Sequence, residues 1–189
     1  MPRFCFVCIG LFAFLPVLSQ QRLLADEILF AFDQPNAAGQ WQIVNDTVMG
    51  GRSFGQRQIN AYRNLEFTGN LSLANNGGFS SIRTRKSGMR LDRDSVIVAR
   101  VRGDGREYKF NVYTQSNMGG YSWRQSFRTV KDQWVDVEFP VSKFVATWRG
   151  RTFRDRTLDP GQIAGLGFLL GDKKPGGFKL EVESIKVRR

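Results

Sequence analysis

Apolar and polar side chains alternate with a period of two in short runs along most of this chain. In the run 107–114, for example, Tyr108, Phe110 and Val112 fall on one side and mostly polar residues lie between them. This period is typical of a half-buried antiparallel strand, because successive side chains of a strand point to opposite faces. We therefore expect a fold built mainly from strands.

Ten runs are predicted to be strands, and glycine-rich turns separate several of them. They are 28–32, 41–45, 65–73, 78–85, 95–102, 107–114, 121–128, 133–139, 163–170 and 179–187. Many short strands at close spacing predict an all-β antiparallel sandwich or barrel. Single helical turns are expected at 142–144 and 159–163, and the stretches 51–64 and 145–162 are expected to be irregular loops.

Two local features are predicted from turns and from the phase of the apolar pattern. The segment from Phe67 to Phe79 contains Asn-Gly-Gly between two strand runs, which predicts a β-hairpin. In the last run, Leu180 and Val182 have one parity while Ile185 and Val187 have the other. A β-bulge near residues 183–184 brings both pairs to one core.

The first 25 residues have the pattern of a targeting segment. Arg3 precedes an apolar run at 4–18, and a more polar stretch leads to the small residue Ala25. This order predicts a secretory signal peptide, cleaved after Ala25 or, as a second choice, after Ser19. The apolar run is shorter than the roughly 20 residues that span a bilayer. We therefore expect a mature domain at 26–189, without a transmembrane span and exported to the periplasm, cell envelope or exterior.

Removal of that segment limits the available chemistry. Both cysteines, Cys5 and Cys8, lie within it, and the whole chain has no histidine. A thiol nucleophile, a Ser-His-Asp triad, the usual zinc or copper ligand sets and disulfides are then excluded. We expect no cofactor and no metal, although a calcium ion held by oxygen ligands is left open.

The balance of charge favours an anionic partner. The formal charge is +11, and loss of Arg3 and Arg22 with the first segment lowers it to +9. A basic domain attracts acidic surfaces. The basic residues are spread along the chain, however, so a solvated basic surface is the alternative interpretation.

The most distinctive motif runs from Asn45 to Ser53, where an Asn-Asp pair is followed by a diglycine. Asn45 and Asp46 are candidates for polar contacts at the rim of a binding face, and a turn held by their side chains is the alternative. We expect the shape of the loop to come first and ligand contacts second. Gly51 is predicted to take a left-handed conformation, which a Cβ disfavours.

Arginine and tryptophan supply the other binding candidates. Arg83 is on a predicted strand face that is either solvated or part of a ligand groove. Trp123 is one of several aromatic residues that are candidates for an exposed binding surface, and core packing is the alternative for each of these aromatics. Four arginines fall within 149–156, and Arg149 and Arg151 are the candidates among them. Arginine pairs with carboxylate or phosphate and stacks on aromatic rings. Export argues against nucleic acid, so an acidic protein surface, an anionic polysaccharide or lipid headgroups are favoured; a solvated loop is the equal alternative.

Catalysis has little support in the sequence. Glycoside hydrolysis needs two carboxylates at a set separation, and no spacing among the 17 acidic residues singles out a pair. Asp46 and Asp172, both near glycine, are weak candidates. No GxSxG motif, phosphate-binding loop or dinucleotide fingerprint is present. We therefore predict that the protein is not an enzyme.

The chain resembles the complex I intermediate-associated protein family. The resemblance rests on the motif from Asn45 to Ser53, on Gly69-Asn70-Leu71-Ser72 and on Asn76-Gly77-Gly78-Phe79, and it extends from about Phe30 to Val187. It implies a galactose-binding-like jelly roll that is not an enzyme. The family positions that transfer to this chain are Asp46, Met49, Gly50, Gly51, Ser53, Gly77, Gly78 and Phe79.

The best-known members of this family are mitochondrial assembly chaperones for respiratory complex I, so the resemblance implies a protein partner, such as an assembly intermediate of a membrane complex. The predicted export signal is a departure from those members. The second hypothesis is a carbohydrate-binding module for envelope or extracellular glycans, which rests on analogy of fold. Exposed coplanar aromatics would favour a glycan, whereas a broad apolar patch would favour a protein.

Overall fold

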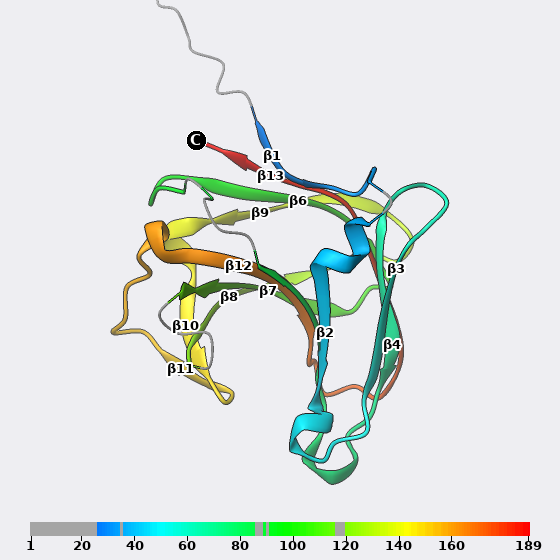
Figure 1. The fold of residues 1–189 in the computed structure, drawn as a ribbon. Coiled ribbons are helices and arrows are strands. Elements are labelled where there is room, and N and C mark those ends of the chain that lie inside the picture. The colour runs from blue at the N-terminus through cyan, green and yellow to red at the C-terminus, as the bar shows by residue number, and fades with distance from the viewer. Residues whose placement is uncertain (1–25, 35, 86–88, 90, 116–119) are drawn as a thin grey trace, which may run out of the picture.

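The computed structural model describes residues 26–189, except 35, 86–88, 90 and 116–119. Strands form two antiparallel sheets that pack face to face (Figure 1). The first sheet has the order β3-β4-β13-β6-β9, with β1 paired to β13. Its strands are β1 (Glu27–Ala31), β3 (Phe54–Ile59), β4 (Leu65–Leu71), β6 (Val96–Gly103), β9 (Trp134–Pro140) and β13 (Gly176–Arg188).

The second sheet has the order β11-β10-β8-β7-β12-β5-β2. Its strands are β2 (Trp41–Asn45), β5 (Ser80–Arg85), β7 (Glu107–Thr114), β8 (Ser122–Arg128), β10 (Val145–Trp148), β11 (Arg151–Phe153) and β12 (Ile163–Leu170). This sheet is arched, and the first sheet covers its convex side (Figure 1). The predicted all-β antiparallel sandwich is confirmed.

Short 3-10 helices occur in the connections between strands. They are η1 (Ala37–Gln40), η2 (Asp46–Met49), η3 (Ala74–Asn76), η5 (Val141–Lys143) and η6 (Pro160–Gln162). The last two correspond to the helical turns expected at 142–144 and 159–163. None of the helical segments within the described part of the chain is long and apolar enough to span a membrane.

Large aromatic side chains fill the space between the sheets. Tyr108 and Phe110 of β7 are fully buried, as the alternation predicts. The ring of Phe110 stacks on Phe139 of the opposite sheet with centroids 4.4 Å apart, and Phe168 of β12 lies 5.1 Å from it. Burial of such rings is a main source of stability in a sandwich, because each removes a large apolar area from water.

The predicted β-bulge is present in β13. Its pairing with β6 shifts register between Val182 and Ser184. Leu180 and Val182 before the shift, and Ile185 and Val187 after it, are all fully buried. The extra residue therefore returns both halves of the strand to one core.

The predicted hairpin is wrong, because β4 and β5 belong to different sheets. The Asn-Gly-Gly segment connects the two layers rather than closing a ladder. Asn75 and Asn76 have positive φ values of 56° and 58°, and the amides of Gly78 and Phe79 donate to the side chain of Asp46. Asparagine tolerates this backbone region and glycine allows it, so the same residues that favour a two-residue hairpin also build this crossing.

Three strands lie in stretches that were expected to be irregular. β3 is within 51–64, and β10 and β11 are within 145–162. The apolar alternation is missing from β3 because one of its core-facing positions is Gly55, where a Cβ would lie 2.3 Å from Ser80 Oγ. β10 and β11 form a short hairpin at the end of the second sheet, too short to establish a period.

Candidate functional site

The Asp46 carboxylate is the centre of the loop that follows β2. Asp46 is fully buried. It accepts hydrogen bonds from the amide of Ser53 at 2.9 Å, the hydroxyl of Ser53 at 2.5 Å, the amide of Gly78 at 2.6 Å and the amide of Phe79 at 3.2 Å. One side chain therefore joins the loop after β2 to the connection between β4 and β5.

These hydrogen bonds keep Asp46 ionised. Burial alone would raise the pKa of its carboxyl group, but the bonds from Ser53, Gly78 and Phe79 outweigh burial and lower the pKa below the usual 3.8. A carboxylate that accepts several N–H groups commonly has a low pKa. Asp46 is therefore a structural anion and a poor candidate for a general acid.

Two positions must be glycine because they lie so close to this carboxylate that a side chain would not fit. A Cβ on Gly51 would lie 2.4 Å from Asp46 Cγ, and a Cβ on Gly77 would lie 2.6 Å from Asp46 Oδ2. The left-handed conformation predicted for Gly51 is wrong, because the positive φ of 86° belongs to Gly50 at the end of η2. In the diglycine, Gly50 is therefore needed for its left-handed backbone, and Gly51 is needed because a side chain would collide with Asp46.

The other motif residues complete the same junction. Asn45 Oδ1 accepts a hydrogen bond from Ser80 Oγ at 2.6 Å, which links β2 to β5. Met49 differs from the rest, because its side chain is 64% exposed. The structure therefore brings Asn45, Asp46, Gly50, Gly51, Ser53, Gly77, Gly78 and Phe79 together. Their contacts hold the loop in shape, and Met49 projects from it.

A second group of polar residues lies on the outer face of the arched sheet. The register of four strand pairings places one row of residues across the five strands β2, β5, β12, β7 and β8. The row consists of Gln42, Arg83, Gly167, Asn111 and Arg124. Their sequence neighbours Ile82, Phe110 and Phe168 point the other way, into the core.

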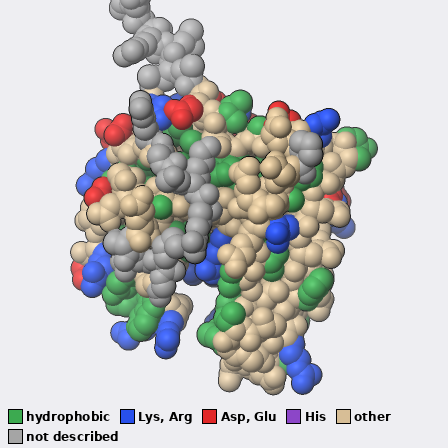
Figure 2. Space-filling model, in the orientation of Figure 1, with side chains coloured by type: hydrophobic (Ala, Val, Ile, Leu, Met, Phe, Trp, Pro, Cys, Tyr) green, Lys and Arg blue, Asp and Glu red, His purple; other side chains and the backbone are tan. Residues whose placement is uncertain are grey.

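This face is hollowed. A groove of about 710 Å³ lies at its β2 end, and Arg83, Tyr113 and Gly165 are among the residues that line it. The Arg83 guanidinium lies 5.1 Å from the centre of the Tyr113 ring. Figure 2 shows the molecule indented between two lobes, with Lys and Arg side chains at the inner end of the indentation.

Two glycines of β12 leave the middle of this face without side chains. Gly165 and Gly167 occupy outward positions of β12, opposite Tyr113 and Asn111 respectively. A Cβ on Gly167 would lie 2.5 Å from Ile82 O and 3.2 Å from Arg83 Cγ. The side chain of Arg83 therefore lies close over the backbone of β12, as strand glycines often allow.

Positive charge accumulates here without acidic partners. Arg83, Lys109 and Arg124 make no ion pair with a carboxylate among the described residues. Burial lowers the pKa of Arg124, and the charge of Arg83 lowers it further. Burial and the charge of Arg124 lower the pKa of Lys109 in the same way. Arg124 therefore lies close enough to Arg83 and to Lys109 for like charges to act on it and on Lys109 in partly desolvated surroundings.

The remaining candidates are divided between the core and the β10–β11 hairpin. Trp123 is only 7% exposed and faces the core, which contradicts its assignment to a binding surface and agrees with the alternative of core packing. Arg149 and Arg151 are exposed on the hairpin. Their guanidinium groups lie 4.9 Å from the ring centre of Trp148 and 5.9 Å from that of Phe153. The structure thus brings neither of them into the row that contains Arg83.

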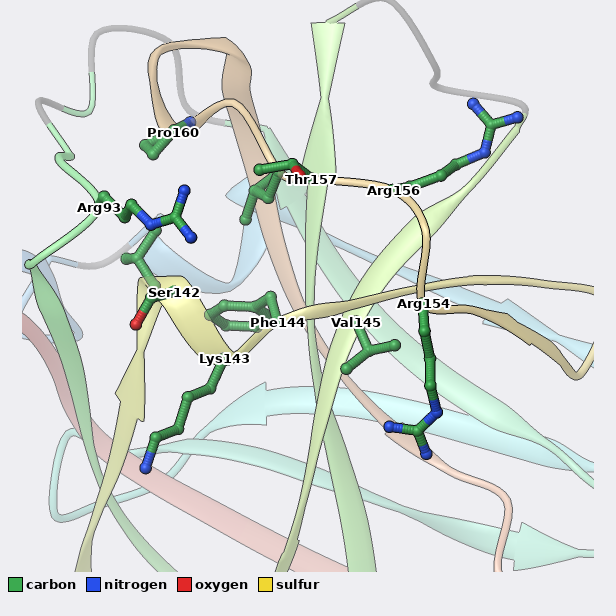
Figure 3. A pocket seen from close by; sticks show the side chains of 11 residues that line it. Arg93, Ser142, Lys143, Phe144, Val145, Arg154, Arg156, Thr157 and Pro160 are labelled. Carbon is green, nitrogen blue, oxygen red and sulfur yellow. The ribbon is translucent and has the colours of Figure 1, made fainter.

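A separate pocket of about 400 Å³ lies beside η5. Its basic residues do not converge: Figure 3 shows the side chains of Arg93, Lys143, Arg154 and Arg156 pointing in different directions. Cations that diverge cannot hold one small anion together. We therefore place the candidate binding site on the arched sheet.

Sequence reasoning missed Lys109, Asn111 and Arg124. Alternation along β7 was visible in the sequence, and it places Lys109 and Asn111 opposite the core residues. The approach of Arg124 to Asn111 depends on the pairing of β7 with β8, which alternation in one strand does not reveal.

The weak catalytic candidates are both engaged in structural contacts. Asp172 forms an ion pair with Arg106, with Nη2 and Oδ1 2.7 Å apart, and Asp46 is buried at the loop junction. Within the described residues, no three acidic, cysteine or histidine side chains gather as a metal site would require.

Comparison with known families decides the relationship of the chain. The family model described as "Complex I intermediate-associated protein 30 (CIA30)" matches residues 30–182, from β1 into β13. The chain belongs to the complex I intermediate-associated protein 30 family. The resemblance inferred from the sequence motifs is confirmed.

Curated relatives in this family carry related names. The Drosophila melanogaster protein named "Complex I intermediate-associated protein 30, mitochondrial" is 25% identical over 84% of this chain and 62% of its own length. The Mus musculus protein of the same name is 35% identical over 49% of this chain and 30% of its own length. This chain thus covers less than two thirds of either relative.

The prediction of export is wrong. These relatives are named as mitochondrial proteins, which points to mitochondria rather than to the cell envelope or exterior. Residues 1–25 lie outside the described residues, so cleavage before Asp26 stays a prediction.

Solved structures share the fold of this family member. A family 11 carbohydrate-binding module from Clostridium thermocellum, in complex with a β-1,3-1,4-mixed-linked tetrasaccharide, matches with a TM-score of 0.66 and 17% identity, covering 86% of this chain and 95% of the module. The agarase AgWH50C matches with a TM-score of 0.62 and 11% identity, covering 86% of this chain and 26% of the agarase. At these identities the likeness concerns the fold alone, and it agrees with the predicted galactose-binding-like jelly roll.

Proposed function

We propose that this chain is a non-enzymatic binding domain that holds a protein partner during the assembly of respiratory complex I. The observation that carries the proposal is the family match over residues 30–182, which spans nearly the whole sandwich. The curated relatives are named for their association with complex I intermediates. The chain spans less than two thirds of the length of these relatives, so the assembly role is proposed here for the sandwich alone.

The geometry supports a binding role rather than catalysis. The Asp46 motif is used to hold a loop, and Asp172 is neutralised by Arg106. The arched sheet presents a hollowed polar face, and its cations make no ion pair within the part of the chain that the structure describes. Such a surface orients a partner through charge and hydrogen bonds.

Glycan binding has less support. Sugar-binding faces commonly expose flat aromatic rings. Trp41 and Trp123 are buried here, and one face of the half-buried Tyr113 ring carries the Arg83 guanidinium. Trp148 is 40% exposed, but the Arg149 guanidinium lies 4.9 Å from the centre of its ring. The likeness to carbohydrate-binding modules shows a shared sandwich, and it does not carry their ligand to this chain.

Deletion of the gene in the source organism tests the proposal. We expect a lower amount of fully assembled complex I and an accumulation of smaller subcomplexes, measured by native gel electrophoresis of solubilised membranes. Re-expression of the full chain is expected to restore the assembled complex. Unchanged complex I in the deletion strain would overturn the assembly role.

A further inference from the structure

The outer face of the arched sheet carries partly buried cations for which the described residues offer no carboxylate partner. Carboxylates elsewhere neutralise Arg100, Arg102, Arg106, Lys179, Arg188 and Arg189. Among the described residues, Arg83 and Arg124 donate hydrogen bonds to serine hydroxyls, at 3.1 Å and 3.3 Å respectively, and to no carboxylate. Two guanidinium groups with spare donors, close enough for the charge of Arg83 to lower the pKa of Arg124, are suited to an anion.

Two buried polar atoms lie at the same place without a partner. Asn111 Oδ1 is an acceptor and Arg124 Nε is a donor, and neither forms a hydrogen bond within the described structure. Asn111 itself is only 1% exposed. Its amide nitrogen donates to Tyr113 Oη at 3.2 Å, which leaves its oxygen directed elsewhere. Buried polar atoms without partners are rare in folded proteins, so each needs a physical explanation, and a bound ligand is one.

The needs of these atoms define the ligand. It must carry negative charge for Arg83 and Arg124, and it must also offer a hydrogen-bond donor to Asn111 Oδ1. A phosphodiester group supplies acceptors only, and a neutral glycan supplies no charge. A polypeptide with acidic side chains supplies both, because each carboxylate is accompanied by backbone N–H groups. An anionic polysaccharide also supplies both, but the family match favours a protein partner.

The shape of the face agrees with an extended chain. Gly165 and Gly167 remove side chains from the middle of the surface, and the groove of about 710 Å³ continues toward β2. Gln42 lies at the far end of the row that begins at Arg124, so polar groups follow one another across five strands. A segment that lies along this row meets cationic and amide side chains in turn.

We propose that the outer face of the arched sheet binds an acidic segment of the partner protein, with carboxylates on Arg83 and Arg124 and a backbone N–H on Asn111 Oδ1. This inference rests on the proposed function, since it names the chemistry that recognises the partner. Arg83 and Arg124 are specificity-determining residues in this assignment, and Asn111 positions the segment between them.

Binding of a defined peptide to the purified full chain tests the assignment. The probe is a short fluorescein-labelled peptide of alternating Glu and Ser, followed by fluorescence anisotropy, and the reference peptide has Gln in place of Glu. We expect the Glu peptide to bind and the Gln peptide not to bind. Arg83→Gln and Arg124→Gln are each expected to weaken binding about tenfold or more, because each removes charge-assisted hydrogen bonds.

Two further variants separate binding from folding. Arg188→Gln removes the same charge from the first sheet, where Arg188 pairs with Glu138, and is expected to leave binding unchanged. Asn111→Asp keeps the side-chain shape, places a carboxylate beside the cations and is expected to abolish peptide binding while thermal stability is retained. Equal losses in Arg83→Gln and Arg188→Gln would mean attraction by net charge alone, and would overturn the assignment.

Other ligands and the assembly role are tested separately. Vesicles that contain an anionic phospholipid, compared with phosphatidylcholine vesicles, report lipid binding; Arg83-dependent binding to them without peptide binding would overturn the acidic segment. In the deletion strain, the Arg83→Gln/Arg124→Gln double variant is expected to fail to restore complex I, whereas Arg188→Gln restores it. If the double variant restores complex I fully, the site assignment fails while the assembly role stands.

Discussion

The hydroxyl of Ser53 donates to Asp46 Oδ2 at 2.5 Å, while the amide of the same serine donates to Asp46 Oδ1 at 2.9 Å. Ser53 thereby contacts both oxygens of a fully buried carboxylate seven positions earlier in the chain. The Ser53 hydroxyl also accepts a hydrogen bond from the amide of Ser72 at 3.0 Å, so the same serine reaches the end of β4. A single pair of side chains thus fixes three separate backbone segments.

Asp46→Ala is expected to lower the free energy of unfolding by about 3 kcal/mol or more, because it leaves several buried donors without an acceptor. Those donors are the amides of Ser53, Gly78 and Phe79 and the hydroxyl of Ser53. Urea denaturation monitored by tryptophan fluorescence measures the change. Unchanged stability combined with loss of partner binding would show that Asp46 acts chiefly as a ligand contact.

Asp159→Ala is the matched control for that experiment. Asp159 is exposed, and it accepts a hydrogen bond from the amide of Gly161 at 3.0 Å at the start of η6. Loss of one exposed cap is expected to cost about 1 kcal/mol or less. The difference between the two aspartates therefore reports burial and the number of donors.

Three glycine-to-alanine substitutions separate space from backbone conformation. Gly39 has open space around it and no left-handed backbone, so Gly39→Ala is expected to be nearly neutral. Gly50 has open space but a φ of 86°, and Gly50→Ala is expected to cost about 1 kcal/mol. Gly51 has an ordinary φ, but its Cβ would lie 2.4 Å from Asp46 Cγ, and this substitution is expected to be the most destabilising.

Thermal melting of the three variants gives the order directly. A Gly51→Ala protein as stable as Gly39→Ala would mean that the Asp46 carboxylate moves aside at little cost. In that case the loop after β2 would be held less tightly than its hydrogen bonds indicate.

The sequence predicted the layers of this fold better than it predicted their connections. Alternation within one strand identified the core face of β7, and the phase change in β13 located the bulge, because both are local consequences of which side chains are buried. The crossing from β4 to β5 resembled a hairpin, since Asn and Gly serve both structures. What decided between them was the Asp46 carboxylate, which is 32 positions from Gly78.

The candidate site was predicted only in part for a similar reason. Arg83 was singled out on its own strand, but its neighbours in space come from β7, β8 and β12. Which strands lie side by side in a sheet is a long-range property, and alternation does not determine it. The motif residues were found easily, yet their contacts hold a loop, so a recognisable motif was a poor guide to a binding surface.

Stability is expected to fall in acid partly through Asp46. The pKa of Asp46 is lowered below its usual 3.8 in the folded protein, so its contribution is present above that value and is lost as pH falls through the folded pKa. Asp46→Asn removes this contribution at every pH. The difference in unfolding free energy between the two proteins is therefore expected to shrink below about pH 4.

Urea denaturation of both proteins over an acidic pH series measures this difference. Glu66, Glu181 and Asp172 also have lowered pKa values, so both proteins lose some stability in acid. Subtracting the two curves of unfolding free energy against pH isolates the contribution of the Asp46 carboxylate. Curves that stay parallel down to the lowest pH would show that Asp46 has the same pKa in the folded and unfolded states.

The ion pair between Arg106 and Asp172 gives the last prediction. Arg106 Nε and Nη2 donate to the two Asp172 oxygens at 3.0 Å and 2.7 Å, and both side chains are largely buried. Arg106 also donates to the carbonyl oxygens of Lys174, Gly176 and Gly177. The pair therefore fastens the connection between β6 and β7 to the connection between β12 and β13.

Asp172→Ala is expected to cost about 3 kcal/mol of unfolding free energy, because it leaves a buried guanidinium without its counterion. Glu138→Ala, which removes the partner of exposed Arg188, is expected to change stability little. Replacing both members of the buried pair, as Arg106→Met/Asp172→Ala, is expected to cost less than the sum of the single changes, since no isolated charge then remains. Urea denaturation of the unchanged protein, Arg106→Met, Asp172→Ala and the double variant measures the coupling between the two side chains. Strictly additive losses of unfolding free energy would mean that the two side chains contribute independently.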